Sequence, residues 1–349
     1  MIVFYIVLAI LLFGLLIFVH EFGHFITAKL FGVRVNEFSM FMGPAIWKKQ
    51  KGETLYALRC IPIGGYCAME GEDGDSDDPR SFTNAAIWKR FIILIAGAAM
   101  NLLAGFVLML LLVGFAFEIV PTRTVASIQP ERPFAGQLQA GDEIYSVNGE
   151  RVYVQQDITM LLDRNTSGKQ ELVVIRDGEK VALHDVPMAR DYGDADDLRY
   201  GFNVEYQDKT VGGVISYSWN SCRDFVRLVR LSLQDLVGGR ASMKDLSGPV
   251  GIVAVVSEQG SAAESIGDGI ANVVYLFALI AVNLAVMNLL PIPALDGGRV
   301  VCMLLSFVIE KIIRRKLNPK IEGYLHAGFM ILLLALMAFI AVQDVIKLF

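Results

Sequence analysis

Four long stretches without charged side chains constrain this sequence more than any other feature. They are residues 1–19, 91–117, 270–296 and 323–343, the third of which is uncharged up to its final aspartate. Each reaches the length of about 18 apolar residues that marks a membrane-spanning helix. The whole chain is 54% hydrophobic and 19% charged, whereas soluble domains carry about 25% charged residues. The sequence therefore predicts an integral membrane protein with four transmembrane helices, and the lipid bilayer is its first expected partner.

The basic residues outside these stretches predict how the chain crosses the bilayer. Nine Lys or Arg lie within residues 29–90, and six lie within residues 299–320. The positive-inside rule places both segments in the cytoplasm, so that both termini and residues 118–269 lie outside. Residues 1–19 lack the basic n-region and the cleavage site of a signal peptide, and we expect them to stay in the protein. The net charge of −5 gives no indication of a nucleic-acid partner.

A short motif with ionisable side chains follows the first stretch directly, and it reads His20-Glu21-Phe22-Gly23-His24. Such side chains are costly at the end of a membrane-spanning helix unless something pairs or coordinates them. On a helix His20 and His24 share one face, so both imidazoles can bind one metal ion while Glu21 stands beside it. This spacing is typical of zinc hydrolases.

A catalytic zinc ion needs a third protein ligand, and Asp296 is the best candidate in the sequence. The first and third stretches both run from outside to inside, so their far ends, with His20 and Asp296, reach the same depth. Pro291 and Pro293 precede Asp296 and break helical pairing, which indicates a protein-lined or hydrated cavity rather than lipid-facing helix. A capping role for Asp296 in an interfacial loop is the alternative.

Two polar side chains inside the stretches remain open in role. Asn101 fits either an interhelical hydrogen bond or a position near the metal. His326 fits an inward-facing, hydrogen-bonded histidine better than a metal ligand, because no other ligand lies at helical spacing from it. The four cysteines form no close pair, and we expect unpaired thiols.

The segments between the stretches predict β structure. Residues 36–69 contain Gly43-Pro44 and a Gly64-Gly65 turn, and they favour short extended pieces over helix. Residues 122–188 predict a compact unit with an Asn148-Gly149 hairpin, a helix at 157–163, and a strand at 170–176 followed by an Asp-Gly turn. Its Gln-Leu-Gln-Ala-Gly-Asp element resembles that of a PDZ domain, with a generic small β domain as the alternative. An amphipathic helix at 219–237 either lies on the outer membrane surface or packs on this unit.

Together these motifs resemble the site-2 protease family of intramembrane zinc metalloproteases (peptidase family M50, RseP type). The resemblance covers almost the whole chain. It rests on the His-Glu-x-x-His motif and the Asn288–Gly297 motif N-x-x-P-x-P-x-L-D-G, together with Gly43-Pro44, Gly64-Gly65-Tyr66 and Ser-Gly-Pro-x-Gly-Ile at 247–252. Two features depart from the family: there is room for one PDZ-like domain instead of two, and Phe41-Met42 precedes Gly43-Pro44 where the family has Gly-Phe.

The resemblance implies a zinc metalloendopeptidase that performs regulated intramembrane proteolysis in the bacterial cytoplasmic (inner) membrane. It implies one Zn²⁺ bound by His20, His24 and Asp296, with Glu21 as general base and acid. Single-span membrane proteins, such as anti-sigma factors and remnant signal peptides, are the implied substrates after a first cut by a site-1 protease. The residues that it implies in substrate binding are Asn288, Pro291, Pro293, Gly43, Gly64 and Gly65.

The expected fold is a membrane α-helical protein with four transmembrane helices, a cytoplasmic re-entrant β-hairpin and an extracytoplasmic PDZ-like α/β domain. The expected parts are a first transmembrane helix with the histidine motif (1–35), the re-entrant hairpin and loop (36–90), a second transmembrane helix (91–117), the PDZ-like domain (118–190), an extracytoplasmic region with an amphipathic helix (191–269), a third transmembrane helix with the Asp296 motif (270–298), a cytoplasmic loop (299–322) and a fourth transmembrane helix (323–345).

Two other functions compete with proteolysis. A transporter or channel could use the same ionisable side chains as an ion path, although four spans without an evident repeat do not favour it. A non-catalytic scaffold built around the PDZ-like unit is the other, and it would have no need of Glu21 as a base.

Overall fold

The computed structural model describes residues 2–72, 74, 76–188, 200–240, 248–314 and 319–347. They form two compact units, one made of residues 1–108 and 228–349 and the other of residues 109–227. The elements of the first unit are α1 (Ile2–Leu30), β1 (Val35–Lys51), β2 (Thr54–Met69), the first part of α2 (Ile87–Ala116), α5 (Pro249–Ser261), α6 (Ile266–Asn288), α7 (Asp296–Ile313) and α8 (Pro319–Lys347).

Four helices are long and apolar enough to cross a membrane. They are Ile2–Leu30, Ile87–Ala116, Ile266–Asn288 and Gly323–Ile346, with 23 to 30 residues each. At 1.5 Å per residue such helices match a hydrocarbon core of about 30 Å. The prediction of a multi-pass helical membrane protein is confirmed to this extent. The sequence did not anticipate α7, which occupies much of the segment that we expected as a loop.

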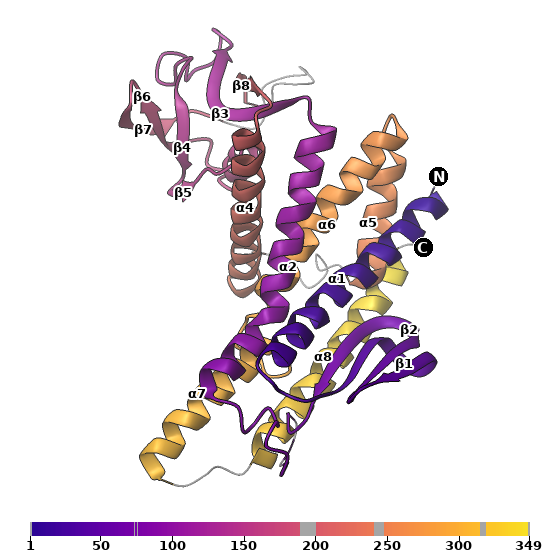
Figure 1. Ribbon diagram of the computed structural model, residues 1–349. Coiled ribbons are helices and arrows are strands. Elements are labelled where there is room, and N and C mark those ends of the chain that lie inside the picture. The colour runs from indigo at the N-terminus through magenta and orange to yellow at the C-terminus, as the bar shows by residue number, and fades with distance from the viewer. Residues whose placement is uncertain are drawn as a thin grey trace. The chain divides into compact units, whose positions relative to one another are not determined.

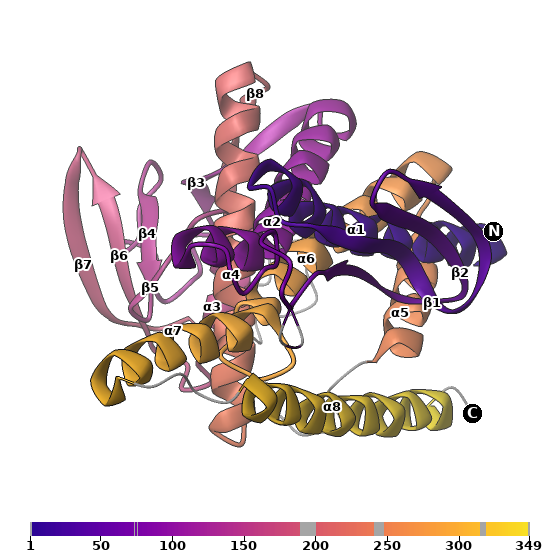
Figure 2. The same cartoon turned by 60° about the horizontal axis from the view of Figure 1, so that its bottom comes forward.

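Small residues let the helices α1, α5 and α6 lie side by side in the first unit (Figure 1, Figure 2). Tyr5 of α1 is fully buried between them. A Cβ atom on Gly260 would lie 2.6 Å from the Tyr5 ring, and one on Gly269 would lie 2.5 Å from the Gly260 carbonyl oxygen. Glycines at these positions allow the close backbone approach on which helix association in membranes depends.

The hairpin β1–β2 is longer than the short extended pieces that the sequence predicted. Each strand bends back on itself, so that Glu37 pairs with both Leu55 and Ala68, and Met40 pairs with both Leu58 and Gly65. Residues 35–40 therefore lie between two segments of β2. The remaining half of β1 pairs with the first segment, which leaves residues 65–69 as an outer strand.

An ion-pair network ties the segments of this hairpin together. The Arg59 guanidinium pairs with Glu37 at 2.6 Å and donates to the Gly43 carbonyl at 2.6 Å. The Tyr66 hydroxyl donates to the same Glu37 carboxylate at 2.7 Å. Charge-assisted hydrogen bonds of this kind are the strong ones, and here they fix the middle strand against both of its neighbours.

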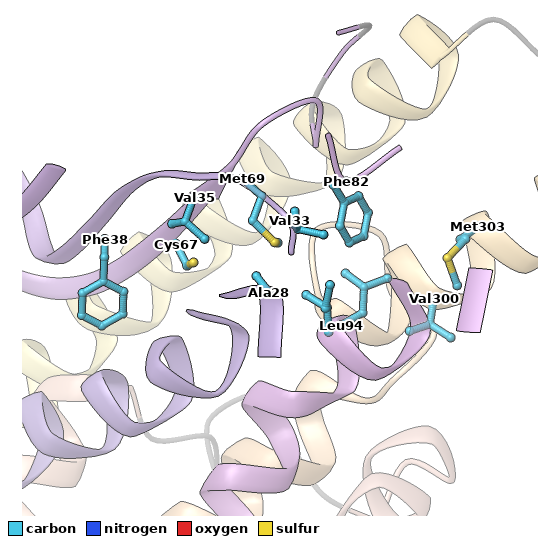
Figure 3. Packing of buried hydrophobic residues seen from close by; sticks show 11 residues of the cluster. Ala28, Val33, Val35, Phe38, Cys67, Met69, Phe82, Leu94, Val300 and Met303 are labelled. Atoms are coloured by element: carbon cyan, nitrogen blue, oxygen red, sulfur yellow. The ribbon is translucent and has the colours of Figure 1, made fainter. Parts of the chain in front are cut away.

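A hydrophobic cluster joins the hairpin to the helices of the first unit (Figure 3). The buried side chains of Val35 and Cys67 in the hairpin point toward Ala28 of α1, and Leu94 of α2 faces Val300 of α7. Close packing of such side chains adds van der Waals attraction between the hairpin and the helices, about 0.1–0.2 kcal/mol for each pair of heavy atoms in contact. The cluster packs the end of α1 and the start of α2 against α7, and two of these helices, α1 and α7, carry the candidate metal ligands.

The second unit contains an antiparallel sheet with the strand order β7-β6-β4-β3-β8 and with β5 paired to β4. Its elements are β3 (Ile119–Ile128), β4 (Glu143–Val147), β5 (Glu150–Arg151), α3 (Gln155–Asp163), β6 (Gln170–Arg176), β7 (Glu179–Val186), β8 (Phe202–Asp208) and the first part of α4 (Val211–Val237).

Two predicted turns in this sheet are confirmed. Asn148 and Gly149 adopt φ values of 50° and 82° between β4 and β5. Asp177 and Gly178 adopt 51° and 84° between β6 and β7. Positive φ at both positions is typical of the type I′ turn of a tight hairpin. The β-containing region is thus established, whereas a PDZ topology stays a prediction.

The part of α4 within the second unit packs on the sheet domain. Phe225 and Arg227 are buried, and the Arg227 guanidinium pairs with Asp157 of α3 at 2.8 Å and with Asp224. Two carboxylates therefore face one guanidinium. Burial of Asp224 and the negative charge of the neighbouring Asp157 raise the pKa of Asp224 to about 8. For the amphipathic helix the sequence left two predictions open, a place on the outer membrane surface or packing on the β unit. The part of α4 up to Arg227 packs on the β unit.

The start of α5 is held by a side chain from α8. Asp344 is buried and accepts backbone N–H groups of Gly248 at 2.8 Å and Gly251 at 2.9 Å. A carboxylate at a helix N-terminus satisfies donors that have no partner within the helix. A Cβ atom on Gly248 would lie 2.8 Å from Asp344 Oδ2, which explains glycine in the Gly-Pro-x-Gly part of the motif; Ser247 lies outside the described residues.

Candidate metal centre

Three predicted ligands meet at one point. His20 and His24 project from adjacent turns of α1, and Asp296 is the first residue of α7. The Nε2 atoms of the two histidines are 3.3 Å apart. Asp296 Oδ2 lies 3.2 Å from Nε2 of His20 and 3.3 Å from Nε2 of His24. The three atoms form a nearly equilateral triangle.

The triangle has the dimensions of three corners of a zinc tetrahedron. Tetrahedral zinc bonds of about 2.0–2.1 Å place neighbouring ligand atoms about 3.3–3.4 Å apart. Asp296 Oδ2 is buried and makes no hydrogen bond, so a cation would satisfy an otherwise unpaired atom. Within the described ranges, this trio is the group of His, Cys, Asp and Glu side chains that could hold a metal. Two imidazoles and one carboxylate, with a fourth position left for water, are a catalytic zinc donor set.

A tight turn between α6 and α7 places Asp296. Within this turn, the Ile292 N–H donates to the Leu290 carbonyl at 2.7 Å and the Leu295 N–H to the Ile292 carbonyl at 3.0 Å. A Cβ atom on Gly297 would lie 2.5 Å from the Leu290 carbonyl oxygen. The glycine after the aspartate therefore lets the start of α7 fold back against the turn.

The other predicted residues of this motif lie in or beside the turn. Asn288 is the last residue of α6, and Pro291 and Pro293 lie within the turn itself. Their role in substrate binding stays a prediction. His326 of α8 also reaches the turn, where its Nδ1 accepts the Ala294 N–H at 2.9 Å.

The second transmembrane helix orients both imidazoles. His24 Nδ1 lies 2.8 Å from the Ile93 carbonyl oxygen. A carbonyl only accepts, so Nδ1 carries the proton and Nε2 keeps its lone pair for a metal. The side-chain amide of Asn101 lies 3.3 Å from His20 Nδ1. The atom placed there is the amide nitrogen Nδ2, and Asn101 Oδ1 has no hydrogen-bond partner among the described residues. With Nε2 of His20 bound to a metal, a flip of the Asn101 amide would let Oδ1 accept the proton of Nδ1.

Asn101 therefore lies next to the metal triangle, which is one of the two positions that the sequence left open. The carbonyl of Ile93 was missed, because a backbone acceptor leaves no sign in the sequence.

Glycines make room for the histidines where α1 and α2 meet. A Cβ atom on Gly97 of α2 would overlap His24 Nε2 and would lie 2.7 Å from His20 Cε1. A Cβ atom on Gly23 of α1 would lie 2.5 Å from the Ala96 carbonyl oxygen. Sequence reasoning missed Gly97, although a glycine inside an apolar helix is a known signal of close helix packing.

The hairpin brings one of its three predicted glycines to the site. A Cβ atom on Gly65 would lie 3.2 Å from Cγ of Glu21 and 3.1 Å from Cγ2 of Ile17. Gly43 and Gly64 instead lie in the bends of the hairpin, with φ values of 85° and 68°. The outer strand 65–69 thus runs directly beside the predicted general base.

We expect the Gly65→Ala substitution to lower the cleavage rate about tenfold or more and to leave the zinc content unchanged. The added methyl group is too close to Glu21 and Ile17, so the carboxylate or the strand must shift, and sub-ångström shifts at a catalytic group are costly. The measurement is initial rate together with metal analysis. Gly74→Ala is the control, because among the described residues no atom lies within 4 Å of a Cβ atom there. Unchanged kinetics in Gly65→Ala would show that this contact is irrelevant to catalysis.

Comparison with known proteins agrees with this site. The model of peptidase family M50 matches residues 8–336. A Clostridium acetobutylicum protein, named as a candidate zinc metalloprotease, is 36% identical over 346 residues, covering 98% of both chains. The zinc metalloprotease RasP of Bacillus licheniformis is 27% identical over 425 residues, covering 97% of this chain and 98% of its own. The regulator of sigma-W protease RasP of Bacillus subtilis is 25% identical over 433 residues, with the same coverage.

These relatives confirm zinc as the predicted cofactor. The family match covers nearly all of the sequence, including the three residues of the metal triangle. The chain therefore belongs to peptidase family M50.

Proposed function

We propose that this protein is an intramembrane zinc metalloendopeptidase that cuts within or near the transmembrane helix of single-span membrane proteins. The observation that carries the proposal is the triangle of His20, His24 and Asp296, which joins one membrane-length helix to the turn that follows another. A structural zinc site has four protein ligands, whereas this one has three and a carboxylate, Glu21, beside them.

The residues around the triangle have separate roles in peptide hydrolysis. A bound Zn²⁺ supplies polarisation of the scissile carbonyl and lowers the pKa of water towards about 7. Glu21 takes a proton from the attacking water and returns it to the leaving amine, so that the C–N bond breaks with no net gain or loss of protons. Ile93 and Asn101 hold the imidazoles in the orientation that exposes both Nε2 atoms.

The outer strand of the hairpin offers a place for the substrate. A peptide bond within a helix has a paired carbonyl, so the substrate must unwind locally before cleavage. An unwound segment can add as a strand beside residues 65–69, which run past Glu21. In this arrangement Gly65 sets the distance to the base, and Gly43 and Gly64 shape the hairpin. Asn288, Pro291 and Pro293 would contact the substrate from the end of α6 and the turn after it.

The substrates that we propose are anti-sigma-factor-like proteins and remnant signal peptides, shortened first by a site-1 protease. The Bacillus subtilis relative, whose name makes it a regulator of sigma-W, supports the first class. The protein would lie in the bacterial cytoplasmic membrane with both termini outside, as the basic segments indicate. The second unit, as a single PDZ-like domain, would exclude large substrates or hold new carboxyl ends.

The test is cleavage of a model single-span protein by purified protein in lipid nanodiscs. We expect about one zinc ion per chain, loss of cleavage on treatment with a chelator, and recovery on adding zinc. Mass spectrometry should place the cut within or next to the apolar stretch of the substrate. Folded protein without metal, or cleavage that resists the chelator, would contradict the proposal. Ion flux through vesicles in the absence of zinc would favour a transporter instead.

A further inference from the structure

A histidine outside the metal triangle reaches the turn that carries Asp296. His326 lies on α8, in the fourth candidate span, and its Nδ1 accepts the backbone N–H of Ala294 at 2.9 Å. Ala294 precedes Asp296 by two residues. We propose that His326 is a positioning residue that sets the place of the Asp296 carboxylate; the inference rests on the metal centre and the proteolysis proposed above.

The turn needs a stabilising contact of this kind, because its backbone conformation at Ala294 is unfavourable. Ala294 has φ = +85°, a region that residues with a Cβ atom rarely adopt and that persists only where the surroundings impose it. One part of these surroundings is the close fit of Gly298, whose Cβ atom would lie 2.5 Å from the Ile292 carbonyl carbon. The imidazole of His326 is another part, and it fixes the amide of Ala294 from outside the turn.

The position of Asp296 is sensitive to this turn. Its Oδ2 completes a triangle with sides of 3.2 and 3.3 Å to the two histidines, and zinc ligands tolerate errors of only about 0.2 Å in bond length. If Ala294 relaxed to an ordinary negative φ, the chain direction just before Asp296 would change. His20 and His24 would stay in place, because α2 holds them separately.

Two polar contacts, one near each end, connect the helix α8 to the rest of the first unit in addition to its packing on α5. Its most apolar 18-residue window contains no buried residue. Near its far end Asp344 accepts N–H groups at the start of α5, and near its inner end His326 binds the Asp296 turn. These two contacts allow the metal effect to be separated from a general loss of stability.

The experiment compares wild type with His326→Ala, His326→Asn and Asp344→Ala, all full-length in nanodiscs. Zinc affinity is measured by competition with a chromogenic chelator. The Co²⁺-substituted proteins are compared by visible absorption, and kcat, KM and melting temperature are measured in parallel. Asn places its Oδ1 where His has Nδ1, so it can accept the Ala294 N–H.

We expect His326→Ala to lower zinc affinity and kcat about tenfold, the range for residues that orient metal ligands, and to alter the Co²⁺ spectrum with little change in KM. His326→Asn should restore most of the affinity and the spectrum. Asp344→Ala should lower the melting temperature and keep wild-type zinc affinity.

The inference is overturned if His326→Ala keeps wild-type affinity, spectrum and kcat, or if His326→Asn is as defective as His326→Ala. Equal loss of zinc in Asp344→Ala would also overturn it, since general destabilisation would then explain the effect. A wild-type protein that binds no zinc or cleaves no substrate would refute the proposed function itself, so the two failures are distinguishable.

Discussion

Replacement of Glu21 by glutamine should reduce proteolysis by about 10²–10⁴-fold, the usual contribution of a general acid–base group. The amide has the same shape as the carboxylate but cannot take up a proton from water. The three atoms of the metal triangle are unchanged, so we expect zinc content, melting temperature and substrate binding to stay at wild-type values. The measurements are single-turnover cleavage of a reconstituted span and metal analysis.

The same chemical change elsewhere serves as the control. Glu53 lies at the turn of the β1–β2 hairpin, where it pairs with Lys29 at 2.7 Å and with Arg80 at 2.7 Å. Glu53→Gln should keep nearly full activity. Full residual activity in Glu21→Gln would remove Glu21 from the mechanism.

A methyl group at position 97 should be nearly as damaging as the loss of a ligand. The Cβ atom of Gly97→Ala would overlap His24 Nε2 and would lie 2.8 Å from its Cε1. His24 cannot turn away without giving up its hydrogen bond to the Ile93 carbonyl, and overpacked side chains of this kind shift neighbours or backbone. We expect zinc affinity to fall about a hundredfold or more, with loss of cleavage, as measured by chelator competition and metal analysis.

Gly114→Ala is the matched substitution in the same helix. Apart from its own helix backbone, no atom of the described residues lies within 4 Å of a Cβ atom at Gly114, and alanine has a better helix propensity than glycine. This variant should bind zinc as the wild type does. Wild-type zinc affinity in Gly97→Ala would show that the two helices separate easily and that their close approach is unimportant.

Much of the site could be predicted because its signals are local or follow from topology. The spacing of His20 and His24 needs only a helix to bring them together. Asp296 followed from the direction of two apolar stretches, and the structure places it in the triangle. Zinc is confirmed by the family match, whereas the catalytic role of Glu21 stays a prediction.

The other residues of the site depend on which faces of the helices meet, and the sequence does not specify these faces. The sequence left two roles open for Asn101, one of them near the metal, and no polar side chain marked Ile93 or Gly97 as facing the histidines. An apolar helix in a bilayer has no polar face that indicates its orientation, because lipid and protein interior are equally apolar.

In the fold, too, features set by local sequence were predicted and features set by distant contacts were not. Turns with strong local chemistry, such as Asn148-Gly149, were predicted correctly. The hairpin β1–β2 was expected only as short pieces, because its middle strand is paired on both sides by distant segments of β2. The helix α7 was missed, since its 18 residues mix apolar and charged side chains and resemble neither a span nor a strand.

The distribution of the metal ligands along the chain has a consequence for biosynthesis. His20 and His24 precede Asp296 and His326 in the chain, so they leave the ribosome first. Two imidazoles alone hold zinc weakly and leave it without the geometry for hydrolysis. A nascent chain that has not yet reached Asp296 therefore lacks the complete donor set, and a product that stops before this residue would not assemble the metal centre.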